Sequence, residues 1–185
     1  MLSNLVMCQQ DYKQTIEAEF TDYLNTIVNM EFEKSVEYIV PEFFDVVPKS
    51  QVIMMMQQGV KSKLMETEIL NPQILKIDNA VKIDGKYYVL LTYSSEMKIR
   101  FFGIEDETKY EKSSRLSMTK GYLEDTFGSD NVYYNDEKDR FDIQSVKDVY
   151  AISENGQDNW RFLVIEKDQK MIIDHVLPTE ISEKL

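Results

Sequence analysis

The sequence LKIDNAVKIDGKYYVLLTYSSEMKIRF, residues 75–101, alternates apolar and polar residues on both sides of Asp84-Gly85. A period of two is typical of half-buried β-strands. An Asp-Gly pair between two alternating runs is a strong signal for a hairpin closed by a two-residue turn. These residues therefore predict a long antiparallel hairpin in the middle of the chain.

Upstream of this hairpin the apolar period changes to 3.6, which is typical of helices. Apolar residues from Tyr12 to Val28 recur every three or four positions and predict a long amphipathic helix. A second apolar set in residues 32–39 ends at Pro41, whose ring disfavours continuation of a helix. Ser50 can cap a third helix, which contains Val52 and Val60 on one face.

Downstream of the hairpin we expect one further helix and a series of strands. The expected elements are an acidic loop at 105–111, a helix at 116–127 ended by Gly128, a hairpin at 132–143, strands at 145–152, 160–166 and 171–177, and a terminal helix at 179–185. Helices followed by antiparallel strands predict an α+β fold in one domain, residues 1–185. Residues 1–10 are expected to be a lead-in, with disorder as an alternative.

Composition excludes several classes of protein. The chain has 185 residues and a formal net charge of -12, and it shows no basic cluster, so nucleic acid is not an expected partner. A single cysteine, Cys8, excludes an intramolecular disulfide, and no run is apolar enough to span a membrane. We expect no cofactor and no metal. A soluble cytoplasmic protein is the expectation, with the cell envelope as the alternative if Cys8 marks a truncated lipoprotein signal.

The order of elements supports a resemblance to a known superfamily. NGQDNWRFLVIEKDQKMIIDHVLPTEISEKL (155–185) and DNVYYNDEKDRFDI (130–143) are similar to bacterial members of the nuclear transport factor 2-like superfamily, also called SnoaL-like or cystatin-like. The resemblance implies N-terminal helices packed in the concave side of a curved antiparallel sheet, with a cone-shaped cavity. Members include isomerases, dehydratases, cyclases and proteins without chemistry, so the fold alone does not define the activity.

The strand predicted at 171–177 places His175, the only histidine, inside this cone. If residues 168–169 form a two-residue turn, His175 lies opposite Phe162. The residues expected around the cavity are His175, Trp160, Phe162, Tyr93, Ser95 and Tyr23. His175 is interpreted either as a general acid or base or as a core histidine. Catalysis would need a carboxylate from elsewhere, such as Glu17 or Glu19.

The opposite face of the predicted sheet is also apolar, which predicts an interface. The expected interface residues are Leu163, Ile165, Ile172, Val176 and Leu90. A contiguous apolar face usually marks a contact surface, so we expect a homodimer, with Arg161 and Asp174 paired nearby. The alternative is that residues 178–185 or 105–111 fold back and cover this face.

Function is predicted from the small number of polar groups available to the cone. The superfamily's isomerases use an aspartate base, but the inward face of the long strand offers Tyr87, Tyr93 and Ser95 without an acid. We therefore expect binding of a small apolar or amphipathic ligand, or a dimeric scaffold, without catalysis. The alternative is an isomerase, dehydratase or cyclase that uses His175. The acidic residues between Asn135 and Asp142 are interpreted as a solvated turn rather than a cation site.

Overall fold

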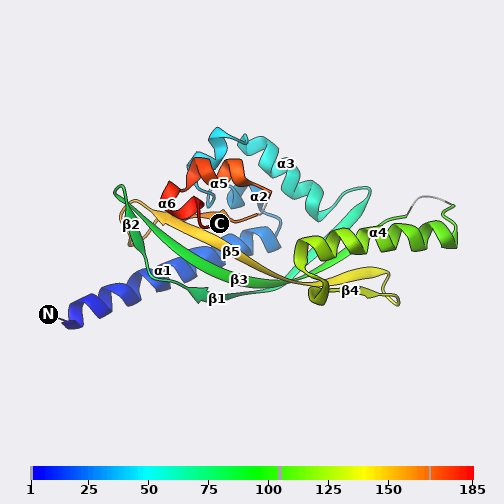
Figure 1. The fold of residues 1–185 in the computed structure, drawn as a ribbon, viewed down its shortest axis with the longest axis horizontal. Coiled ribbons are helices and arrows are strands. Elements are labelled where there is room, and N and C mark those ends of the chain that lie inside the picture. The colour runs from blue at the N-terminus through cyan, green and yellow to red at the C-terminus, as the bar shows by residue number, and fades with distance from the viewer. Residues whose placement is uncertain (1, 104–105, 167) are drawn as a thin grey trace. The chain divides into compact units, whose positions relative to one another are not determined.

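A computed structural model describes residues 2–103, 106–166 and 168–185, with the backbone alone for residues 2–11 (Figure 1). The helices are α1 (Leu2–Val28), α2 (Phe32–Ser35), the 3-10 helix η1 (Pro41–Asp45), α3 (Lys49–Val60), α4 (Lys109–Phe127), the 3-10 helix η2 (Ser129–Asn131), α5 (Lys170–Val176) and α6 (Thr179–Ser182). The strands are β1 (Met65–Ile77), β2 (Val81–Ile83), β3 (Lys86–Phe101), β4 (Val132–Asn135), β5 (Arg140–Ser153) and β6 (Arg161–Val164).

The described strands form one sheet in the order β1-β3-β5-β4, with β2 paired to β3 and β6 paired to β5. The long strands β3 and β5 lie side by side in Figure 1. The α+β class is therefore confirmed, whereas a cone-shaped cystatin-like sheet stays a prediction. The chain divides into two compact units: unit 1 (Met1–Met54, Ile74–Tyr93 and Lys147–Leu185) and unit 2 (Met55–Gln73 and Ser94–Val146).

Both predicted hairpins are confirmed. In the first, Val81 pairs with Tyr88 and Ile83 pairs with Lys86, which leaves Asp84 and Gly85 as the two-residue turn. Both turn residues have positive φ, 47° and 92°, as a turn that matches strand twist requires. In the second hairpin, β4 pairs with β5 from Val132↔Ile143 to Asn135↔Arg140.

Unit 1 places helices on both faces of its strands. Phe162 of β6 packs against Phe20 of α1, and its neighbour Leu163 belongs to a second core on the opposite face. This second core contains Leu163 with Val40, Tyr88, Ile152, Ile173, Val176, Leu177 and Ile181, so it joins the strands to α5 and α6. Residues 38–40 also run parallel to β6, because the Phe162 amide and carbonyl bond to Tyr38 and Val40.

The predicted strand at 171–177 is wrong, because residues 170–176 form α5. The buried residues of this segment, Ile173 and Val176, are three apart, and Leu177 follows. Ile173 and Val176 share a face only in a helix, whereas Ile173 and Leu177, four apart, share a face in a helix and in a strand. Lys170 and Asp174 form an i,i+4 ion pair of 2.9 Å on the exposed face, which supports the helix.

The apolar outer face of the sheet is covered by the chain itself. Leu163 and Val176 are buried in the second core, and Ile165 and Ile172 are half-buried against it. Leu90 of β3 is half-buried. The expected pair of Arg161 and Asp174 does not form: Arg161 donates to the Trp160 carbonyl at 3.0 Å, and Asp174 binds Lys170. Packing within the chain therefore accounts for the burial of Leu163, Ile165, Ile172 and Val176, and the homodimer stays a prediction.

Unit 2 packs α4 on one face of its strands. Leu123 of α4 is buried with Ile99 of β3, Val132 of β4 and Phe141 and Ile143 of β5. Helix α4 begins at Lys109, so the end of the expected acidic loop is helical, and residue 105 lies outside the described residues. Helix α1 likewise begins earlier than expected, at Leu2, within the expected lead-in.

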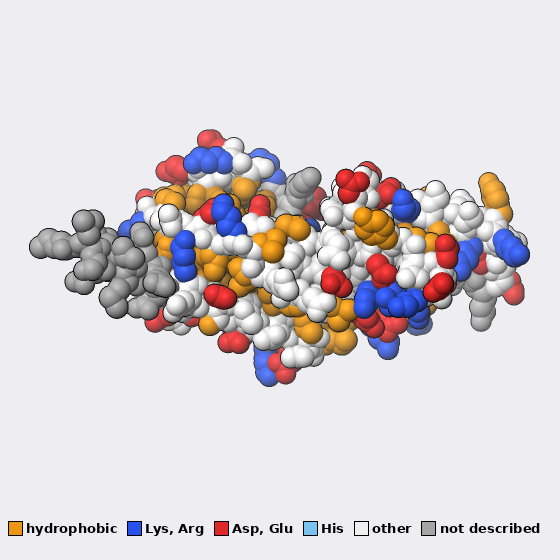
Figure 2. Space-filling model, turned by 90° about the horizontal axis from the view of Figure 1, so that it is seen from below, with side chains coloured by type: hydrophobic (Ala, Val, Ile, Leu, Met, Phe, Trp, Pro, Cys, Tyr) orange, Lys and Arg blue, Asp and Glu red, His pale blue; other side chains and the backbone are white. Residues whose placement is uncertain are grey.

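Charges of both signs occur on the surface. Figure 2 shows acidic and basic side chains interspersed with apolar ones on one face of the molecule. Among the helices that the structure describes, none is both long enough and apolar enough to cross a bilayer. The side chain of Cys8 lies outside the described residues.

Candidate functional site: a groove along helix α4

Three of the predicted pocket residues pack together inside unit 1, around Phe20 of α1. The centroid of the Phe20 ring lies 4.9 Å from that of Phe162 and 5.2 Å from that of Tyr93. Tyr23 stacks on Phe162 with their centroids 5.8 Å apart. Edge-to-face and stacked arrangements such as these are favoured for aromatic pairs in a core. These residues therefore fill space with one another, as core residues do.

Burial raises the pKa of both tyrosine hydroxyls in this aromatic core. It raises the pKa of Tyr93 to about 12, and the negative charge of Glu166 adds to the effect. Burial also raises the pKa of Tyr23, and Tyr93 contributes in the same direction. Both hydroxyls therefore stay protonated near neutral pH.

Trp160 is fully buried and is the last residue of the loop that precedes β6. Its ring centroid lies 6.2 Å from that of Tyr12, and its Nε1 donates to the Gln157 carbonyl at 3.3 Å. Glu19 accepts hydrogen bonds from the backbone N–H groups of Asn159 (3.1 Å) and Trp160 (2.6 Å). Glu19 thus holds this loop against α1. Ser95 is buried on β3 and belongs to unit 2.

The structure places His175 on the exposed side of α5. Its Nε2 lies 3.4 Å from Asp45 Oδ2, and the two side chains are 46% and 69% exposed. This partner is neither Glu17, which is exposed, nor Glu19, which binds the Trp160 loop. The expected position among Trp160 and Phe162 is wrong, because residues 170–176 form a helix rather than a strand.

The acidic turn between β4 and β5 is satisfied by neighbouring side chains. Asp139 accepts a short hydrogen bond from the Tyr134 hydroxyl and forms an ion pair with Lys112 at 2.9 Å. Asp142 pairs with Arg140 at 2.8 Å. No group of three or more metal-ligating side chains occurs among the described residues. Two carboxylates of the turn, Asp139 and Asp142, are therefore paired with cationic side chains.

A groove of about 520 Å³ lies along the first half of α4, within unit 2. Its lining residues are Asp106, Glu107, Tyr110, Glu111, Ser114, Arg115, Met118 and Thr119. This volume falls within the range of sites that bind small ligands. None of these residues was expected to line the cone.

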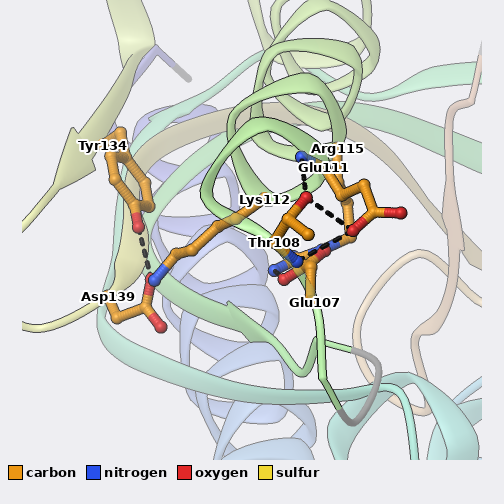
Figure 3. Close-up of polar contacts among 7 residues, drawn as sticks. All are labelled: Glu107, Thr108, Glu111, Lys112, Arg115, Tyr134 and Asp139. Atoms are coloured by element: carbon orange, nitrogen blue, oxygen red, sulfur yellow. Dashed lines mark hydrogen bonds and ion pairs between the residues drawn. The ribbon is translucent and has the colours of Figure 1, made fainter.

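A capping box fixes the start of the helix that lines the groove. The Thr108 hydroxyl accepts from the Glu111 amide at 3.2 Å, and Glu111 Oε2 accepts from the Thr108 amide at 2.8 Å (Figure 3). The Thr108 hydroxyl also donates to Glu111 Oε2 at 2.6 Å, and this bond, together with the one from the Thr108 amide, lowers the pKa of the Glu111 carboxyl. Thr-x-x-Glu is a recognisable sequence signal for a helix start, and it could have located this helix end.

An ion pair lines the groove beside the capping box. Arg115 Nε and Nη2 donate to Glu107 Oε1 and Oε2 at 2.7 and 2.9 Å, a bidentate geometry (Figure 3). Arg115 lowers the pKa of Glu107, mainly through these hydrogen bonds. A side chain at Gly103 would place its Cβ 2.7 Å from Glu107 Oε2, so glycine lets the ion pair pack against the backbone. Such a pair is rigid because both planar groups are fixed at two points.

The walls of the groove combine apolar and acidic side chains. Tyr110 and Met118 are 82% and 75% exposed, so their apolar surface is available to a ligand. Asp106, Glu107 and Glu111 give three carboxylates against one guanidinium, Arg115, which is a formal charge of -2. The groove can therefore bind an apolar group and a positive charge together.

Comparisons of the chain with protein-family models, with curated proteins and with solved structures gave no match. The resemblance to the nuclear transport factor 2-like superfamily stays a prediction.

Proposed function

We propose that this protein binds an amphipathic, positively charged ligand in the groove along α4, without chemical conversion of that ligand. The observation that carries the proposal is the groove itself, in which exposed Tyr110 and Met118 lie beside the acidic side chains. The charge of the whole chain, -12, favours cations in the same way. Among the lining side chains, Glu107 and Arg115 are paired and Glu111 caps the helix, while Nη1 of Arg115 is buried without a hydrogen-bond partner among the described residues.

The charges in the groove favour a positively charged ligand. Arg115 pairs with Glu107, and the hydrogen bonds from Thr108 leave the negative charge of Glu111 in place. A cation in the groove would therefore gain attraction from Asp106 and Glu111. An anion would meet the same carboxylates and be repelled. An alkyl chain would at the same time cover the apolar surface of Tyr110 and Met118.

Methionine methyl NMR can test this proposal, because the chain offers an internal control. Met118 lines the groove and is 75% exposed, whereas Met171 on α5 is 76% exposed and does not line it. The probe is decyltrimethylammonium, added below its critical micelle concentration. At about 0.3 kcal/mol for each of its roughly 14 non-hydrogen atoms, binding amounts to about 4 kcal/mol, or a Kd of about 1 mM.

We expect the Met118 methyl resonance to shift saturably while that of Met171 stays in place. Asp106→Asn should weaken binding, because it removes a charge while asparagine tolerates the positive φ of 64° at this position. Decyl sulfate, which has the same chain and the opposite charge, should bind more weakly. Equal shifts of both methionines, or equal binding of both surfactants, would contradict the proposal.

A further inference from the structure

The apolar surface beside the groove continues along α4 beyond the groove itself. Tyr110, Met118 and Tyr122 are spaced by eight and four residues, and they are 82%, 75% and 71% exposed. At about 100° per residue they fall within about 120° of the helix circumference. Tyr122 does not line the groove, which ends at Thr119. The three side chains form one row, here called the α4 stripe.

The length of the α4 stripe exceeds what a small molecule can cover. Tyr122 lies twelve positions after Tyr110, which corresponds to about 18 Å along the helix axis. Ser114 and Gly121 lie between the large side chains on the same face, and both are small. An occupant that contacts all three side chains must therefore be elongated. It can approach the α4 backbone closely at the small residues Ser114 and Gly121.

The charges beside the α4 stripe are acidic. Glu111 and Asp125 fall within the same arc of the helix and are exposed. Lys109, Lys112 and Lys120 fall on the other side of the helix, where Lys112 pairs with Asp139 and Lys120 pairs with Glu124. The partner surface that complements this face is therefore apolar along one line and basic beside it.

We propose that the occupant of the α4 stripe is a basic amphipathic helix of a partner protein, about 12 residues or longer. Leucine-like residues at helical spacing would pack against Tyr110, Met118 and Tyr122, and lysines or arginines would face Glu111 and Asp125. A second copy of this chain fits less well, because two such faces would bring like charges together. The inference rests on the proposed function, since the groove supplies the first half of the surface.

A synthetic peptide provides the test. The probe is a fluorescein-labelled 14-residue amphipathic helix of leucine and lysine, and the matched control replaces every lysine by glutamate. Fluorescence anisotropy with the full chain should show binding of the basic peptide, weakened as salt rises from low to high concentration. The acidic peptide should bind at least about tenfold more weakly, since like charges oppose it.

Variants separate this inference from the proposed function. Tyr122→Ala should weaken binding of the basic peptide about tenfold, as expected for loss of one aromatic anchor. The same variant should leave the titration of the Met118 methyl resonance with decyltrimethylammonium unchanged. Met171→Ala is the control and should bind like the parent protein. Circular dichroism checks that each variant is folded, which is expected because both side chains are exposed.

The outcomes distinguish the two proposals. If decyltrimethylammonium binds at Met118 but the peptide does not, or if Tyr122→Ala has no effect on the peptide, the helical partner is overturned and the groove stands. If neither probe binds, both proposals fail. If sedimentation shows a dimer that Tyr122→Ala dissociates and the peptide does not bind, the occupant is a second copy and the inference is overturned.

Discussion

Replacement of Gly156 by alanine tests the packing of the loop before β6 against the first hairpin. A Cβ at this position would lie 2.6 Å from Cγ of Tyr87 and 2.7 and 2.8 Å from its two Cδ atoms. The Tyr87 ring would have to move, and it is already covered by Lys82, whose Nζ lies 4.9 Å from the ring centroid. Gly156 also has φ of +70°, which costs any other residue energy.

Gly85 supplies a matched control for the magnitude. It too has positive φ, +92°, but no atom lies within 4 Å of a Cβ placed there. The left-handed backbone costs alanine about 1–2 kcal/mol, partly offset by about 0.4–1 kcal/mol from the stiffer unfolded chain. We therefore expect Gly85→Ala to lower the free energy of unfolding by about 1 kcal/mol. Gly156→Ala adds about 1–3 kcal/mol for overpacking, for a total of about 2–4 kcal/mol.

Urea unfolding followed by Trp160 fluorescence is the appropriate assay. Trp160 is the single tryptophan, is fully buried, and belongs to unit 1 with Gly85, Tyr87 and Gly156. In a Tyr87→Ala background the cost of Gly156→Ala should fall to that of Gly85→Ala, because the clash is absent. Equal losses for the two glycine variants in the parent protein would refute the reasoning.

Two further predictions concern α1 and the aromatic core. Glu19→Ala should lower the free energy of unfolding by about 1–3 kcal/mol, because the amides of Asn159 and Trp160 lose their acceptor, while Glu17→Ala, on an exposed residue, should change it by less than about 0.5 kcal/mol; equal effects in urea unfolding would contradict this role. Because burial raises the pKa of Tyr93 to about 12, its neutral form contributes stability that is complete below about pH 10 and is lost as pH rises through 12. Tyr93→Phe should therefore flatten the alkaline loss of stability in pH-dependent unfolding, and an unchanged profile would show that Tyr93 is not the group responsible.

Local signals in the sequence determined several elements correctly. The Asp84-Gly85 turn and the hairpin from Val132 to Ile143 follow from alternation and turn chemistry, which act between neighbouring residues. The long first helix follows from its apolar stripe, because Ile16, Phe20 and Tyr23 are all buried. The α+β class depends on these same periods and was therefore predictable.

Where the apolar spacing fits both a helix and a strand, only tertiary packing determined the secondary structure. Ile172, Ile173 and Val176 are β-branched and favour strands, yet they pack as one face of a helix on the second core. That choice moved His175 from the interior to the surface, and it covered the face that suggested a dimer. Propensity is a weak preference, and burial against Tyr88 and Leu163 outweighs it.

The groove illustrates the same division between local and tertiary causes. The sequence itself contains the capping box of Thr108 and Glu111, so the start of α4 was within reach of a local argument. The bidentate pair of Glu107 and Arg115, and the position of Tyr110 and Met118 beside it, depend on how the preceding loop folds along the helix. From the sequence we expected only the later part of this helix, at 116–127, and a loop at 105–111, whereas the groove lies along residues 110–119. Only tertiary structure determined the groove, because a concave surface requires segments to meet in space.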